Sequence, residues 1–260
     1  MNRQNLYIGF YNAIKESYFK YLLFGDRSEE KLKPLHAWVG NTIKMVIPDL
    51  YDVYFLNGKE VQTEGEYYTK IIDVAIVRKE VKVIKRRVGF KSVFYIPEIE
   101  MAVSIKFITS NFKQNANNYF ENLLGECANL RARGIKFGHF VVFRDKIPYF
   151  ERGGKIRNWE ILNDDDINKY IKLFQAREKF FHAPNLIGIE IININPIVEE
   201  AYNKKPKFTK EEISEVIRTG RITIQNGIWN TKLSNEVTRF ILDNFNLFQF
   251  FRNINNIVNK

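Results

Sequence analysis

The sequence predicts an α/β fold, in which helices flank a central mixed β-sheet and a helical extension follows at the C-terminus. Two patterns indicate this class. Apolar residues recur at three- and four-residue steps in two N-terminal segments, residues 6–24 and 32–46, which is typical of amphipathic helices. β-Branched and aromatic residues dominate short segments that are typical of strands, residues 51–56, 67–77, 101–108, 137–143 and 186–194. Helical patterns separate and follow these strands, as α/β architectures require.

The length and composition set the expected domain organisation. With 260 residues, 45% hydrophobic and 15% aromatic, the chain is long enough to bury one large core. We expect residues 1–195 to form the α/β core with its two N-terminal helices. Residues 196–260 are expected to form the C-terminal helical extension, either as a subdomain or as part of the same domain.

The charge balance indicates the class of partner. Forty basic residues against 30 acidic ones give a formal charge of +10, so the surface should attract polyanions. Nucleic acid is the first such partner to test, and a basic protein without this function is the alternative. The single cysteine, Cys127, excludes an internal disulfide and a cysteine zinc cluster. Charged residues interrupt the first apolar segment, so we expect no signal peptide and no membrane span, and a cytoplasmic location.

Two charged residues lie inside the apolar strand patterns. Asp73 lies within residues 67–77, and Lys106 lies within residues 101–108. A buried charge is costly unless it is paired, so neighbouring strands are expected to place this carboxylate beside this ammonium. Ser104 points to the same face as Lys106, because strand side chains alternate. The alternative is that Asp73 lies on the solvent face of an edge strand.

An Asp on one strand followed by x-Lys on the next resembles the PD-(D/E)XK nucleases, in which Asp, Glu and Lys surround one or two magnesium ions. Ile72 stands where the family has Pro, and Ser104 stands where it has Glu. The Ser-x-Lys form is similar to one branch of the type II restriction endonucleases, which includes readers of CCGG cores and takes its glutamate from the following helix. The resemblance covers residues 71–143 and implies a restriction-endonuclease-like sheet.

Two glutamates on the following helix are candidates for the relocated ligand. Glu121 lies 15 residues after Lys106, close to the spacing in that branch, whereas counting back from Asn129 and His139 favours Glu126. Their side chains would lie about 140° apart on a helix, so only one is expected to face the metal. The sequence leaves both open.

Three groups of polar residues are candidates for DNA contacts. They are a basic segment (Lys82, Lys85, Arg86 and Arg87), a segment before the long helix (Asn111, Lys113, Gln114 and Asn115) and a C-terminal loop (Arg221, Gln225 and Asn226). Lys and Arg bind phosphates, and Asn and Gln pair with base edges. The alternatives are a solvated charged hairpin, a helix cap at Asn111, and a hydrophobic turn around Trp229. The CCGG-reading residues of the branch are absent.

The resemblance implies a Mg²⁺-dependent type II restriction endonuclease that cleaves double-stranded DNA at a short sequence, with Mn²⁺ able to replace Mg²⁺. Asp73 and one of Glu121 or Glu126 would hold the metal, Lys106 would orient the attacking water, and Ser104 would hydrogen-bond within the site. A symmetric target implies a homodimer, and the aromatic terminal helix, residues 234–251, is a candidate subunit contact. The alternatives are a non-catalytic nucleic-acid-binding protein and a structure-specific repair or recombination nuclease. His36 and His139 are expected to be packed structural residues.

Overall fold

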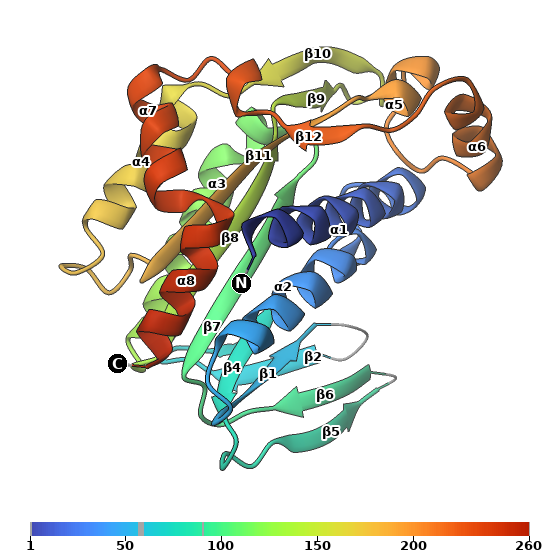
Figure 1. Ribbon diagram of the computed structural model, residues 1–260. Helices are drawn as coiled ribbons and strands as arrows, with labels where there is room; N and C mark the ends of the chain where they lie inside the picture. The colour runs from blue at the N-terminus through green and yellow to red at the C-terminus, as the bar shows by residue number, and fades with distance from the viewer. Residues whose placement is uncertain (1, 57–59, 90, 260) are drawn as a thin grey trace.

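A computed structural model describes residues 2–56, 60–89 and 91–259, and its centre is a six-stranded sheet (Figure 1). In spatial order the strands are β1 (Tyr51–Phe55), β4 (Val74–Arg78), β7 (Met101–Ile108), β8 (Lys136–Arg144), β11 (Leu186–Ile194) and β12 (Ile224–Asn226). β8 is parallel to both β7 and β11, whereas the other neighbouring strands are antiparallel. The predicted mixed sheet is therefore confirmed.

Helices cover both faces of this sheet (Figure 1). The core on one face includes residues of α1 (Arg3–Phe24), α2 (Lys33–Val46) and α8 (Leu247–Val258). The core on the other face includes residues of α3 (Phe112–Arg131), α4 (Asp164–Gln175) and α7 (Asn235–Phe240). No helix in the described ranges is long and apolar enough to cross a membrane. The predicted α/β class with flanking helices is confirmed.

The side chains of β7 alternate between these two cores. Met101, Val103 and Ile105 pack with α1, α2 and α8, whereas Ala102 and Ile108 pack in the core that contains α3. Because strand side chains point to opposite faces with a period of two, Ser104 and Lys106 share the α3 face with Ala102. The face of the sheet on which the candidate site lies is thus fixed by the sequence pattern of this strand.

A second sheet lies beside β1 and β4 at one end of the molecule (Figure 1). Its four strands are β3 (Thr69–Ile71), β2 (Glu60–Glu64), β6 (Lys91–Tyr95) and β5 (Ile84–Val88), and β9 (Lys146–Phe150) pairs with β10 (Ile156–Ile161) separately. The dipeptide Asn57–Gly58 is typical of a two-residue hairpin turn, but it lies outside the described residues. The strands before and after it, β1 and β2, belong to different sheets. The predicted strand over residues 67–77 is also two strands, since the chain passes from β3 of the second sheet to β4 of the central sheet.

The C-terminal segment contributes to the central sheet and its core. β12 is an edge strand of the sheet, and α8 packs against β11. The remaining short elements are η1 (Glu29–Lys31), α5 (Ile197–Tyr202), α6 (Lys210–Thr219), η2 (Ile228–Asn230) and η3 (Ile241–Phe245). Residues 196–260 therefore contain more than helices.

The predicted terminal helix over residues 234–251 is broken. The Asn246 side chain accepts a hydrogen bond from the backbone N–H of Gln249 at 3.0 Å and caps α8, so a new helix begins there. The break turns Phe245, Leu247 and Phe251 into the chain's own core, where each is fully buried. These aromatic and apolar side chains are thus used within the chain and are not free for the subunit contact that the sequence predicts.

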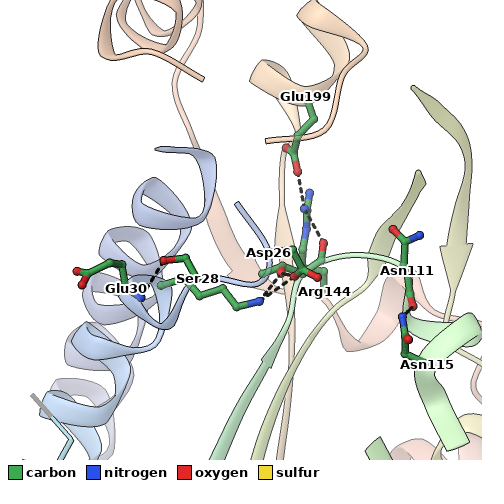
Figure 2. A network of polar contacts seen from close by, with 9 residues as sticks. Asp26, Ser28, Glu30, Asn111, Asn115, Arg144 and Glu199 are labelled. Carbon is green, nitrogen blue, oxygen red and sulfur yellow. Dashed lines mark hydrogen bonds and ion pairs between the residues drawn. The ribbon is translucent and has the colours of Figure 1, made fainter. Parts of the chain in front are cut away.

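A buried ion pair joins the end of β8 to α5. Arg144 donates from Nη1 to Glu199 Oε1 at 2.7 Å, and both side chains are fully buried (Figure 2). Tyr18 of α1 donates its hydroxyl to the same carboxylate. Burial by itself lowers the pKa of Arg144, but the Glu199 charge outweighs it, so the guanidinium stays protonated. The pair connects three elements around one end of the sheet.

Replacing Arg144 by Met should destabilise the fold strongly. The change leaves the Glu199 carboxylate buried without its cation, and breaking a buried pair in this way costs about 3–5 kcal/mol. Chemical denaturation should therefore show this loss in the free energy of unfolding. Arg157→Met is the matched control, because Arg157 is exposed on β10. Equal stability of the two variants would show that the buried pair contributes little.

Candidate active site

Asp73 lies where the chain leaves the second sheet and enters the central one. Its Oδ2 accepts a hydrogen bond from the backbone N–H of Ile105 at 2.7 Å, which fixes the carboxylate against β7. The preceding residue, Ile72, donates its own N–H to the carbonyl of Val61 at 2.8 Å. A proline has no N–H, so the family's usual proline would lose this bond. Asp73 is 19% exposed and lies at a junction between strands, rather than in the middle of a strand or on an edge-strand face.

Lys106 lies one strand away, on the α3 face of β7. Burial by itself lowers the pKa of its ammonium, but the negative charges of Asp73 and Glu126 outweigh burial and raise it above its ordinary value. The side chain is therefore a cation at neutral pH, stabilised by the charges of two carboxylates that line the same cavity. Among the described residues no direct ion pair joins Asp73 to Lys106, so the predicted pairing is present only as an electrostatic interaction within one cavity.

The two candidate glutamates of α3 are placed very differently. Glu126 is 12% exposed and lines a small cavity together with Asp73 and Lys106. Glu121 is exposed to solvent and does not line that cavity. The angular separation of about 140° along the helix explains why only one of them faces the sheet. The structure therefore brings Glu126, and not Glu121, to the predicted site.

The cavity has the size and chemistry of a small-ion site. Its volume is about 40 Å³, enough for a water molecule or an ion. Its walls come from β3, the β3–β4 junction, β7, α3 and β8. The lining residues are Lys70, Ile71, Ile72, Asp73, Ala102, Val103, Ser104, Lys106, Glu126 and Phe137. The Ser104 hydroxyl is buried there without a hydrogen-bond partner in the described chain. A buried hydroxyl without a partner, in a cavity that two carboxylates also line, suits the uptake of a polar guest.

The donor set is compatible with Mg²⁺. Within the described ranges, no three His, Cys, Asp or Glu side chains converge closely enough to hold a metal ion. Mg²⁺ is commonly held by only one or two carboxylates, with waters and substrate phosphate oxygens completing its coordination. Asp73 and Glu126 supply two such carboxylates, so they fit a Mg²⁺ ion that also binds substrate.

Lys70 belongs to this site although the sequence analysis did not select it. Its Nζ lies 2.8 Å from Glu126 Oε1, so the β3 lysine pairs with the α3 glutamate. The β2–β3 turn is held against α3 by Asn129, whose Oδ1 accepts from the N–H of Tyr67 at 2.8 Å. Gly65 allows this approach, because a Cβ at that position would lie 2.1 Å from the Asn129 amide. In the sequence, the position of Lys70 three residues before Asp73 is the one signal that could have indicated its place in the site.

Two buried histidines lie near the carboxylate and the lysine. His36 of α2 has its Nε2 3.9 Å from Asp73 Oδ1, and neither ring nitrogen has a hydrogen-bond partner among the described residues. Burial lowers the pKa of His36 despite the nearby Asp73 charge, so the ring is neutral at pH 7. His139 pairs with Ser104 across β7 and β8, and burial, with a further contribution from Lys106, lowers its pKa to about 3. Both are packed residues, but His36 also lies beside the predicted metal ligand.

The predicted DNA-contact residues fall into two places. Gln114 and Asn115 line a larger cleft next to the cavity, and Asn111 lines it as well. The Asn111 side chain bonds Phe150 of β9 through Oδ1 and Nδ2, and it does not cap α3. The other predicted DNA-contact residues are exposed and line neither the small cavity nor the larger cleft. They are Lys82, Lys85, Arg86, Arg87, Lys113, Arg221, Gln225 and Asn226.

No protein-family model matches the chain, and no curated protein matches it. The chain is similar in structure to NucC of P. aeruginosa ATCC27853 in its cAAA-bound form, with 11% sequence identity and a TM-score of 0.42 over 92% of this chain and 97% of that chain. It is also similar to NucC of E. coli MS115-1 in its cAAA-bound form, with 11% identity and a TM-score of 0.38 over 92% of this chain and 96% of that one.

Proposed function

We propose that this protein is a Mg²⁺-dependent endonuclease of the PD-(D/E)XK type, which hydrolyses phosphodiester bonds in double-stranded DNA. One observation carries the proposal: Asp73 of the β3–β4 junction, Lys106 of β7 and Glu126 of α3 line one cavity. Two carboxylates and a lysine that line one cavity are the parts that metal-assisted phosphodiester hydrolysis needs. The +10 formal charge of the chain suits a polyanionic substrate.

Each residue of the site has a distinct chemical task. Asp73 and Glu126 would hold Mg²⁺, which supplies Lewis-acid polarisation of the phosphate and a more acidic bound water. The Lys106 ammonium orients the attacking water and stabilises the negative charge that develops on the phosphate oxygens. The Ile105 N–H keeps the Asp73 carboxylate in place, and the Ser104 hydroxyl, which has no partner among the described residues, would hydrogen-bond a group bound in the cavity.

A non-catalytic nucleic-acid-binding protein is the second candidate. The Lys70 ion pair with Glu126 favours it, because Lys70 and Lys106 together balance the charges of Asp73 and Glu126 without a metal. In that case the cluster would be a structural ion network. A Mn²⁺ titration separates the two functions, since a nuclease binds the ion at Asp73 and Glu126 and a passive binder does not.

The proposed specificity is that of a type II restriction enzyme acting as a homodimer, because cutting both strands of a symmetric site takes two active sites. We would incubate the protein with a long unmethylated DNA of known sequence, with Mg²⁺ or with EDTA, and sequence the fragment ends. Discrete Mg²⁺-dependent fragments sharing one short sequence are expected. Cleavage confined to branched or flapped DNA would favour a structure-specific nuclease, and salt-sensitive binding without any cleavage would contradict the nuclease.

Glu126→Gln should lower Mg²⁺-dependent cleavage by about 100-fold or more, since one ligand contributes a few kcal/mol at the transition state and each 1.36 kcal/mol is tenfold. Glu121→Gln is the matched control on the same helix, because Glu121 is exposed and does not line the cavity. Cleavage rates at saturating DNA measure the effect. A larger loss in Glu121→Gln than in Glu126→Gln would reverse the assignment.

A further inference from the structure

A second space adjoins the proposed active site and shares Lys106 with it. This cleft has a volume of about 420 Å³, and Lys106 lines both the cleft and the small cavity. The two spaces therefore meet at the Lys106 side chain. Because the cleft is of small-molecule size, it suits a single nucleotide rather than a double helix.

One face of α3 gives the cleft a row of amide side chains. Asn115, Asn118 and Asn122 all line it, at helical steps of three and four residues. Glu126 follows Asn122 by another four residues, so the row of amides leads along the helix to the proposed metal ligand. Asn118 and Asn122 are exposed and have no hydrogen-bond partner in the described chain, and their amides are free to pair with base edges.

Basic side chains, which could bind a phosphate, line the same cleft. Arg27, Lys31, Lys106 and Lys205 contribute positive charge, and Asp26 contributes the one carboxylate among the cleft's described residues. Lys31 Nζ already lies 2.8 Å from Asp26 Oδ1 and 3.0 Å from Thr109 Oγ1, which neutralises that carboxylate. Figure 2 labels Asp26, Asn111 and Asn115, which line the cleft, and shows the Asn115 amide bonded to the Asn111 carbonyl. The cleft therefore presents net positive charge beside amides.

We propose that this cleft is a nucleotide subsite, which holds one unstacked nucleotide of the cleaved strand next to the scissile phosphate. Asn118 and Asn122 bond the base, and the exposed cations Arg27 and Lys205 attract the adjoining phosphate. Tyr119, which also lines the cleft, offers a ring for stacking. The assignment to the cleaved strand rests on the proposed nuclease function. It makes Asn118 and Asn122 binding residues, outside the catalytic group.

The test uses metal-free protein, so that it does not depend on cleavage. The four deoxynucleoside 5′-monophosphates are titrated in EDTA into ¹⁵N-labelled protein, and the side-chain amide signals of asparagine are followed by NMR. We expect the Asn118 and Asn122 amides to shift, and the double variant Asn118→Ala/Asn122→Ala to bind about tenfold more weakly, the loss of one good base contact. Asn117→Ala, exposed on the same helix and about 100° from Asn118, should bind like the unmodified protein.

Two results would overturn the subsite. One is the absence of any shift at Asn118 and Asn122 when nucleotides are added. The other is that inorganic phosphate alone produces the same shifts with the same affinity, which would leave a phosphate site without base contacts. If nucleotides bind as expected but no DNA is ever cleaved with Mg²⁺, the subsite stands and the nuclease function fails. If DNA is cleaved but neither amide responds, the nuclease stands and the subsite fails.

Discussion

Asp73→Asn is expected to reduce Mg²⁺-dependent DNA cleavage by about 1000-fold or more, because a lost metal ligand removes several kcal/mol of transition-state stabilisation. The substituted amide can still accept the hydrogen bond from the Ile105 N–H, so the local backbone should be retained. The same variant should bind Mn²⁺ much more weakly, while its affinity for DNA in EDTA stays within a few-fold.

The measurements for Asp73→Asn are single-turnover cleavage, Mn²⁺ titration and DNA binding, each beside Asp49→Asn. Asp49 is exposed before β1 and does not line the cavity, so this control removes the same charge without touching the site. If Asp73→Asn cleaves DNA with an unchanged dependence on Mg²⁺, Asp73 is not a metal ligand.

Lys106→Met is expected to abolish cleavage with little loss of DNA binding. In the proposed mechanism the Lys106 ammonium stabilises the charge on the reacting phosphate. Removing one such stabilising group costs about 100- to 1000-fold in kcat. Met nearly matches the length of the lysine side chain, so the packing between Ile105 and Phe107 should change little. Metal affinity should be retained, because both carboxylates remain.

Lys15→Met provides the control for Lys106→Met, since Lys15 is exposed on α1. The comparison needs cleavage rates, filter binding of DNA and the thermal unfolding temperature. Full activity in a folded Lys106→Met protein would remove the lysine from the catalytic mechanism. Inactivity with an intact fold and intact DNA binding is the result that the catalytic role predicts.

Much of the fold follows from local patterns. In β7 the polar residues Ser104 and Lys106 alternate with apolar neighbours, and α3 has a helical apolar period, so Ser104 and Lys106 share the face that α3 covers. In the structure, capping boxes at Asn163 and Thr209 likewise fix the starts of α4 and α6. These features depend on residues that are neighbours in the sequence.

The parts that the sequence left open depend on contacts between distant segments. The change from β3 to β4 at Asp73 follows from which strands pair, and no local pattern encodes that choice. Glu121 and Glu126 are equally plausible on an isolated helix, and only the packing of α3 on the sheet turns Glu126 inward. The closeness of Lys70 to Glu126, 56 residues apart in sequence, has the same origin.

The central claim is that Asp73, Glu126 and Lys106 surround the ion and phosphate at which DNA is cut. The most direct measurement is a crystal structure of the Lys106→Met protein with a DNA duplex and Mn²⁺, in which anomalous scattering locates the ion. We expect the ion to contact the carboxylates of Asp73 and Glu126 and one DNA phosphate, with residue 106 beside that phosphate. An ion bound elsewhere, or a DNA backbone that does not approach this cavity, would contradict the claim.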